Sequence, residues 1–186
     1  LIEDVHRIAR LLDVNTWMDY KGKGANVHLA SSYLARWLEE SCGRGARNKR
    51  LPGWVMVLPQ EQQREVLKAA WLGDGTLNKA TPGWLSYTSI SRTLATQMRS
   101  LLLRQGIYGA ISSHVPRQPE KQVAYTIVVQ RAESFNKLAH ILGFQERKEP
   151  SWQFKDTHID GDYLVSGLRS VKVERFTGDV YDLQVP

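Results

Sequence analysis

The order of helices and strands repeats along this chain, and this repeat limits the folds that the chain can adopt. Residues 60–143 are expected to form a helix, two strands, a helix, two strands and a helix, judged from the spacing of their apolar residues. Residues 1–43 are expected to form a helix, two strands and a helix, which is the same unit without its first helix and hairpin. The sequence therefore predicts an α+β fold with one complete and one truncated αββαββα unit. A chance match of element order is the alternative.

Serine and glycine mark several of the expected helix ends. Ser31 and Gly43 flank one helix, while Ser91 and Gly106 flank another, because serine caps helix starts and glycine ends helices. The remaining expected elements are helices over 2–14, 60–73 and 132–142, with strands over 17–20, 27–30, 75–77, 84–89, 108–115 and 123–130.

The charge of the chain is unevenly distributed. Lys and Arg number 25 against 19 Asp and Glu, giving a net charge of +6. Residues 1–150 hold 21 basic and 13 acidic residues, a net of +8, whereas residues 151–186 hold 4 and 6, a net of −2. A basic body of this kind favours a polyanionic partner, most simply nucleic acid.

Two further features bear on the class of protein. The sequence has no apolar run near the roughly 18 residues of a membrane span and no signal-peptide pattern, so membrane and secretory classes are not expected. Cys42 is the single cysteine, which excludes an internal disulfide and a thiolate zinc site. A reducing compartment, the cytoplasm, is the expected location.

One helix ends in an aspartate, which is an unfavourable place for a carboxylate. Ala69 and Gly73 are four residues apart and share a helix face on which small residues allow another helix to approach closely. Asp74 follows at the C-terminus of that helix, where an exposed carboxylate costs about 0.3–1 kcal/mol. A divalent cation bound there would reverse that penalty. Two such helices would bring two aspartates together, as metal-dependent phosphodiester cleavage requires. The alternative is that Asp74-Gly75 is an ordinary tight turn.

Residues 67–75 resemble the motif of the LAGLIDADG homing endonucleases, in the variety that is embedded in inteins. The final Asp74 and Gly75 match in position. The segments 48–55 and 88–107 resemble the linker before the second motif of these enzymes and the stretch that follows it. The resemblance covers roughly residues 1–145.

The resemblance implies double-strand DNA cleavage at a long target with Mg²⁺ as cofactor. Asp74 would be the acidic metal ligand, and the Gly73 carbonyl would assist it. Lys79 and Lys49 would be the candidates for the basic residue near the scissile phosphate, although a solvated surface lysine is the alternative for each. The residues that could face DNA are Arg47, Lys49, Lys79, Arg92, Arg117, Lys121 and Arg131.

The resemblance also divides the chain. Residues 1–150 would be the endonuclease region, made of a truncated first unit (1–43), a basic linker (44–59) and a second unit (60–145). Residues 151–186 would be the C-terminal part of an intein splicing domain, a Hint domain.

The acidic tail is expected to be β-rich. Strands are predicted over 163–165, 171–174 and 180–185, with a turn at 177–179. An ordinary β-hairpin is one interpretation. The other is that residues 178–183, with Asp182 as the splicing-segment residue, are similar to the β-segment near the C-terminus of inteins. Two departures limit that similarity, because the chain lacks the terminal His-Asn pair of inteins and Cys42 is internal. Splicing by these 186 residues alone is therefore not expected.

The truncated first unit lacks the first motif helix, and hence a first catalytic aspartate. We therefore expect a companion that supplies this helix and the N-terminal splicing half, because the half-sheet would otherwise expose an unpaired edge. The companion is either a separate chain, as in a split intein, or a segment of the full protein that these 186 residues do not include. A LAGLIDADG-like module that binds nucleic acid without cutting is the alternative function, and a fragment that acts mainly in protein splicing is the other. The five histidines are expected to be structural or surface groups.

Overall fold

The computed structural model describes residues 2–22, 24–78, 83–115, 122–145, 157–160, 163–168 and 170–179. The chain divides into two units, residues 1–153 and 154–186, and each is described by itself. The domain boundary predicted after residue 150 lies within residues 146–156, outside the described part, and stays a prediction.

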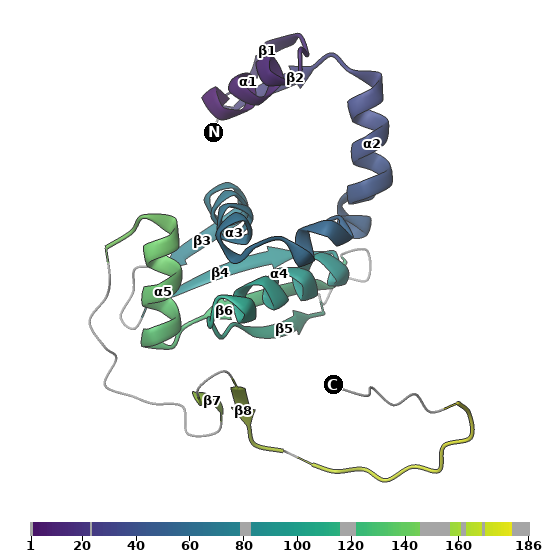
Figure 1. Ribbon diagram of the computed structural model, residues 1–186, viewed down its shortest axis with the longest axis vertical. Coiled ribbons are helices and arrows are strands. Elements are labelled where there is room, and N and C mark those ends of the chain that lie inside the picture. Colours follow the sequence, from purple (N-terminus) through teal and green to yellow (C-terminus); the bar gives the residue numbers. More distant parts are fainter. Residues whose placement is uncertain are drawn as a thin grey trace. The chain divides into compact units, whose positions relative to one another are not determined.

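The second half of the first unit contains the complete set of elements. In chain order these are α3 (Gln60–Asp74), β3 (Gly75–Asn78), β4 (Trp84–Ser89), α4 (Arg92–Arg104), β5 (Ala110–His114), β6 (Ala124–Val129) and α5 (Ala132–Leu142). The strands form an antiparallel sheet of order β3-β4-β6-β5. Helices α3 and α4 pack on the strands and α5 packs on α3, as Figure 1 shows. The predicted αββαββα unit is confirmed.

The hydrophobic core lies between the sheet and the helices. Each of the two central strands directs alternate residues inward, as a pleated strand with one covered face must. Leu85 and Tyr87 of β4 lie opposite Val129 and Ile127 of β6, and all four are buried. The helices contribute the other buried side chains, which include Leu67, Trp71, Leu94, Met98, Leu101, Leu102, Phe135, Leu138 and Leu142.

Two glutamines anchor the linker onto this core. The predicted linker contains two short 3₁₀ helices, Ala46–Asn48 and Gly53–Val57. Buried Gln63 donates from Nε2 to the carbonyls of Val55 and Met56, both at 3.1 Å. Gln97 accepts from the Leu51 N–H at 2.8 Å and donates to the Leu51 carbonyl at 2.9 Å. These bonds satisfy backbone groups that would otherwise be costly to bury, and they fix the linker against α3 and α4.

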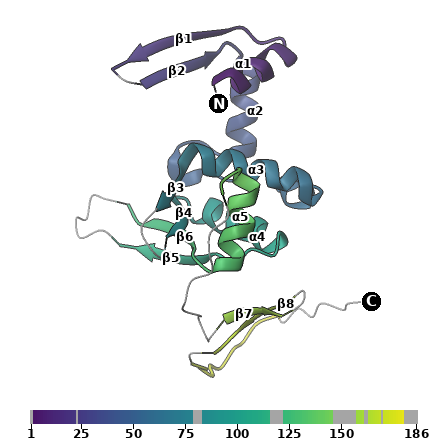
Figure 2. The ribbon, with the colours of Figure 1, turned by 90° about the vertical axis from the view of Figure 1, so that its left-hand side faces the viewer.

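The first half of this unit has the expected shorter order of elements. It contains α1 (Ile2–Leu11), β1 (Thr16–Lys21), β2 (Gly24–Leu29) and α2 (Ser32–Cys42). The two strands form an antiparallel ribbon, which Figure 2 shows. Ser31 caps α2 by accepting from the Leu34 N–H at 3.1 Å, and Gly43 ends the helix with a φ of 82°. Both caps agree with the sequence prediction.

The two halves correspond at a constant spacing. Strand β6 begins and ends 100 residues after β2, and α5 begins and ends 100 residues after α2. Gly43 and Gly143, which follow the two helices, have positive φ values of 82° and 75°. Residue n of β2 or α2 therefore occupies the position of residue n + 100 in the complete unit.

Burial differs sharply between the corresponding positions. Leu138 of α5 is 0% exposed, whereas Leu38 of α2 is 43% exposed. Val129 of β6 is 0% exposed, whereas Leu29 of β2 is 37% exposed. Since apolar residues occupy both members of each pair, the first half has the pattern of a core-forming unit without the elements that would cover it.

The C-terminal unit differs in part from the predicted tail. Strand β7 (Thr157–Asp160) pairs with β8 (Tyr163–Ser166), so the strand predicted over 163–165 is confirmed and its partner was not predicted. The strand predicted over residues 171–174 is wrong, because these residues have no regular secondary structure. Alternation alone does not make a strand where no described segment pairs with it. The predicted return strand at 180–185 and Asp182 lie outside the described residues.

The junction of α3 and β3 gives a test of this fold. A Cβ at Gly75 would lie 2.4 Å from the Trp71 carbonyl oxygen, so Gly75→Ala must displace backbone and is expected to lower the free energy of unfolding by about 1–3 kcal/mol. A Cβ at Gly73 would meet nothing within 4 Å, so Gly73→Ala is the matched control and is expected to stabilise α3 by up to about 1 kcal/mol. Denaturant unfolding of both variants measures this, and equal effects would contradict the described junction.

Candidate functional site

Asp74 is the last residue of α3, and the chain enters β3 directly after it. Its side chain is exposed, and within the described part of the chain no hydrogen bond or ion pair engages its carboxylate. The N–H of Gly75 donates to the Trp71 carbonyl, which is the last bond of the helical pattern. The carbonyls of residues 72–74 therefore have no helical donor, so the negative end of α3 coincides with the free carboxylate.

Helix α3 has two faces with opposite roles. Leu67 and Trp71 are buried at 0% and 4% exposure and attach the helix to the core. Ala69 and Gly73 are exposed on the other side. The small-residue face predicted from the sequence is therefore open in this chain. It is available for close packing with another helix, at the end where Asp74 lies.

Tyr87 lies beneath this end of α3. It is paired with Gly75 across the β3–β4 ladder, and its ring is tilted against that of Trp71 with the ring centroids 5.3 Å apart. Burial raises the pKa of the Tyr87 phenol, and the negative charge of Asp74 raises it further. No sequence signal pointed to this tyrosine, because its closeness to Asp74 depends on the strand register.

A cleft of about 420 Å³ lies between the linker and the middle of α3. Arg44, Lys49 and Arg50 line it together with Ala70 and Tyr87. The Lys49 carbonyl accepts from the Ser91 hydroxyl at 2.5 Å, which fixes the backbone of the linker there. The structure thus brings Lys49, predicted near the reacting phosphate, to the same cleft as Tyr87.

The uncovered face of the four-stranded sheet carries mostly polar side chains, with no Asp, Glu, Lys or Arg among its described residues. Thr88 and Thr126 lie directly opposite each other, and their hydroxyls are 3.0 Å apart. Residues that alternate with the buried ones share that face, and they offer donors, acceptors and one indole ring. They are Thr76, Trp84, Ser86, Thr88, Ala110, Ser112, His114, Ala124, Thr126 and Val128.

The corresponding face of the β1–β2 ribbon is also polar. Trp17 stacks on His28 with ring centroids 4.9 Å apart and an interplanar angle of 4°. Asn26 donates from Nδ2 to Asp19 Oδ1 at 2.7 Å, and His28 Nε2 lies 3.4 Å from Asp19 Oδ2. None of these residues was predicted as a site residue, because alternation of apolar residues locates a strand without showing what its outward side chains do.

The other predicted DNA-contacting residues are dispersed. Arg47 and Lys49 are exposed in the linker, and Arg92 is exposed at the start of α4. The Arg131 guanidinium lies over the Tyr108 ring, 5.1 Å from its centroid, at the start of α5. Lys79, Arg117 and Lys121 lie outside the described residues. Their roles stay predictions.

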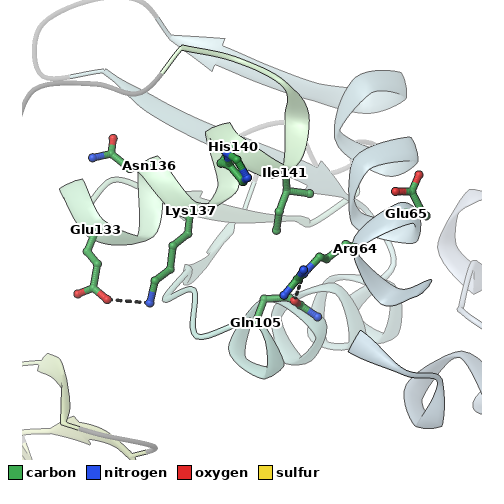
Figure 3. A pocket seen from close by; sticks show the side chains of 8 residues that line it. All are labelled: Arg64, Glu65, Gln105, Glu133, Asn136, Lys137, His140 and Ile141. Carbon is green, nitrogen blue, oxygen red and sulfur yellow. Dashed lines mark hydrogen bonds and ion pairs between the residues drawn. The ribbon is translucent and has the colours of Figure 1, made fainter. Parts of the chain in front are cut away.

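A hollow of about 730 Å³ lies among α3, α4 and α5, on the helical side of the sheet (Figure 3). Glu133 and Lys137 form an ion pair at its rim, with 2.8 Å between Oε1 and Nζ. Arg64 donates from Nε to Gln105 Oε1 at 2.8 Å. These charged groups are engaged with neighbours in the hollow, and none of the predicted site residues lines it.

Two kinds of feature are absent from the described residues. No group of three or more His, Cys, Asp or Glu side chains in the described ranges could hold a metal ion. No helix in the described part is long and apolar enough to cross a membrane.

The LAGLIDADG-like domain family matches residues 61–143, which run from the first turn of α3 to the glycine after α5. The matched residues include the motif predicted at 67–75.

Three curated relatives match longer stretches of the chain. The ATP-dependent DNA helicase Hel308 of Thermococcus kodakarensis is 25% identical over 174 residues, which cover 90% of this chain and 15% of the helicase. Protein MJ0043 of Methanocaldococcus jannaschii is 28% identical, with 100% of this chain and 24% of the relative covered. The DNA polymerase II large subunit of T. kodakarensis is 29% identical, with 70% and 8% covered. The chain thus spans less than a quarter of the length of each.

The homing endonuclease I-DmoI has a similar fold. A variant of I-DmoI in complex with its target DNA and Mg superposes with a TM-score of 0.55 at 12% identity, covering 76% of this chain and 70% of I-DmoI. I-DmoI in complex with DNA and Mn superposes with a TM-score of 0.54 at 15% identity, with 76% and 71% covered. At these identities the similarity concerns the fold, and it confirms the predicted α+β, LAGLIDADG-like architecture.

The position of Tyr87 predicts a fall of stability at alkaline pH. Because the pKa of its phenol is raised above 10.0 in the folded protein, folding favours the protonated form. The stabilisation is therefore complete below pH 10 and is lost as pH rises through the folded-state pKa. Denaturant unfolding between pH 8 and about 11 should show a smaller fall in Tyr87→Phe and an intermediate one in Asp74→Asn. Identical curves for all three proteins would contradict this arrangement.

Proposed function

We propose that this chain is the endonuclease region of an intein-type LAGLIDADG homing element, which cleaves double-stranded DNA once its first motif is supplied. One observation carries this proposal: α3 ends in a carboxylate that no described residue engages by a hydrogen bond or ion pair, beside an open face of small residues. A carboxylate in that position opposes the helix dipole, so the arrangement becomes favourable when a cation is bound.

The residues at the end of α3 suit a hard divalent cation such as Mg²⁺. Asp74 would supply a carboxylate oxygen, and the Gly73 carbonyl, which has no helical donor, would supply a second oxygen. Bound Mg²⁺ would polarise the scissile phosphate and stabilise the charge that develops on it. The protein itself would hold Asp74 in place, because buried Trp71 packs the end of α3 onto the sheet and Gly75 joins this helix directly to β3.

The linker would supply positive charge at the same site. Lys49 lies on a backbone held by Ser91 and Gln97, and it shares its cleft with Arg50 and Tyr87. A lysine anchored through its backbone reaches a phosphate with less loss of conformational freedom than one on a mobile loop. Lys49 is therefore our candidate for the basic residue near the scissile phosphate, with Lys79 as the second candidate.

The polar sheet faces would read the DNA. Hydroxyl, imidazole and amide groups can bond to base edges, whereas arginine and lysine at the periphery contact phosphates without regard to sequence. The sheet face that includes Thr88 and Ser112 offers hydroxyl groups for base edges. The cationic linker offers side chains for phosphates. I-DmoI, which has a similar fold, was solved with its target DNA.

A companion segment or chain would supply the missing first motif. The exposed Ala69 and Gly73 permit close approach of a second small-faced helix, which would place a second aspartate near Asp74. The uncovered apolar residues of α1 and α2, such as Ile8 and Leu38, support the same proposal. A first half without a core gains stability only when further elements cover it.

Insertion into a host protein is supported by the pattern of relatives. The chain matches only 15% of a helicase and 8% of a DNA polymerase subunit, two proteins with different named activities. A segment shared by otherwise different proteins behaves as an inserted element. Residues 151–186 would then be the resumed splicing domain, with Asp182 in its final β-segment, and the element would act in the cytoplasm.

The role of Asp74 can be tested in the completed protein with Mg²⁺. Asp74→Asn is expected to lower the cleavage rate more than about 100-fold, because loss of even an indirect metal partner costs about 10–100-fold. DNA affinity should be kept or rise, since a negative charge near phosphate is removed. The cleavage substrate is duplex DNA of the host gene without the element, so that the two flanking sequences are joined. Unrelated duplex DNA is the reference.

The matched control is Glu61→Gln, which makes the same charge change at the opposite end of α3 and should leave the rate unchanged. Cleavage that survives Asp74→Asn would overturn the catalytic proposal. Binding without cleavage by the wild-type completed protein would favour the non-cutting module.

Phosphate binding by the linker predicts a defined salt effect. Replacing Arg47 or Lys49 by alanine should reduce the slope of log K against log salt by about 0.9 for each phosphate that the replaced side chain neutralises. The decrease in affinity should be equal for target and unrelated duplex. Binding titrations at several salt concentrations measure both. An unchanged slope would remove these residues from the proposed interface.

A further inference from the structure

The polar face of the β1–β2 ribbon carries a cluster of four side chains, Trp17, Asp19, Asn26 and His28. The register pairs Trp17 with His28 and Asp19 with Asn26, and residues two apart on a strand share a face, so all four lie together. Helix α1 contacts the other face, where His6 Nδ1 lies 2.8 Å from the Thr16 hydroxyl. Among the side chains that the structure describes, Asp19 is therefore the charged group that faces His28.

The fold itself does not require this cluster. Positions 26 and 28 of β2 correspond to Thr126 and Val128 of β6, whose partners on β5 are Ser112 and Ala110. The complete unit thus forms the same pair of strands with neither a ring stack nor a charge at the four corresponding positions. A carboxylate and an imidazole on this face of the ribbon need another explanation.

Asp19 fixes the protonation pattern of the His28 ring. Asn26 donates from Nδ2 to Asp19 Oδ1 at 2.7 Å, and His28 Nε2 lies 3.4 Å from Asp19 Oδ2. Nε2 is buried and forms no hydrogen bond with any described residue. Because a carboxylate only accepts, Nε2 carries the proton in the neutral ring, and Nδ1 is the nitrogen that gains or loses one. The His28 side chain is 39% exposed, so a ligand can approach it.

The surroundings favour a charged His28 ring when DNA is near. Asp19 supplies a negative charge within ion-pair distance. The Trp17 ring lies parallel to that of His28 with the centroids 4.9 Å apart, a distance at which an aromatic ring attracts a cation. With neutral His28 the four side chains carry the negative charge of Asp19, which the phosphates of DNA repel, and protonation cancels that charge.

We propose that protonated His28 is a DNA contact that donates from Nδ1 to an acceptor on the DNA, so that binding takes up one proton at this residue. Phosphate oxygens and purine N7 atoms are acceptors of this kind. Trp17, Asp19 and Asn26 position the ring. This inference rests on the proposed function for the identity of the ligand, and it adds a proton to the binding reaction.

DNA binding by the completed protein at several pH values tests the proposal. The probes are duplex DNA of the host gene without the element and an unrelated duplex. The association constant should fall by up to about tenfold per pH unit as pH rises from about 5.5 to about 8, because the contact is lost with its proton. His28→Gln should lower the affinity about tenfold near pH 6 and leave it nearly unchanged near pH 8. An equal loss for both duplexes identifies a phosphate acceptor, and a loss for the host duplex alone identifies a base.

Asp19→Asn separates the proposed contact from a purely structural role of the cluster. It removes the charge that DNA repels, so the affinity near pH 8 should rise, and the fall in affinity should move to lower pH. A structural ion pair predicts instead that Asp19→Asn and His28→Gln lose affinity equally at every pH. His140→Gln, the same replacement at the hollow among the helices, is the matched control and should keep the wild-type pH dependence. Wild-type pH dependence in His28→Gln would overturn the proposal.

The outcomes also separate this inference from the proposed function. Binding that takes up a proton at His28, without cleavage, keeps the contact and rejects the nuclease. Cleavage by a protein whose His28→Gln variant binds DNA with unchanged pH dependence keeps the nuclease and rejects the contact. Failure to bind either duplex rejects both.

Discussion

The packing of α3 on the sheet through Leu67 and Trp71 fixes the orientation of this helix, and the candidate site depends on that orientation. With those two side chains buried, the helix must turn Ala69 and Gly73 outward and end with Asp74 at the strand boundary. Gly75 makes the junction possible, because any side chain there would strike Trp71. A carboxylate is thereby held against the unfavourable end of a dipole, and the free energy of holding it there is supplied by the hydrophobic contacts beneath.

The two halves of the first unit show how far similar patterns can differ in burial. Both contain a helix, a hairpin and a helix, and α2 and α5, which lie 100 residues apart, place leucine at corresponding positions. Only the complete half has an extra helix and hairpin to close the core, so Leu138 is fully buried and Leu38 is not. Elements with correct local propensity still depend on tertiary cover for most of their stability.

Local signals in the sequence were sufficient for most of the fold. Ser31, Ser91 and Gly43 marked helix ends because capping is a local interaction, and α5 was predicted with the bounds it has. The strand predicted at 171–174 was wrong because pairing is non-local and alternation does not reveal a partner. Asp74 was singled out by its motif, and its role stays a prediction, whereas Tyr87 gave no sequence signal, since only the β3–β4 register brings it under α3. The Trp17–His28 stack was missed for the same reason.

The uncovered ribbon also has a consequence for the life of the protein in a cell. A strand edge with free backbone groups and apolar neighbours accepts any extended peptide that reaches it, including the same ribbon of another copy. The β1–β2 ribbon, taken alone, is therefore prone to self-association through the edge of β2.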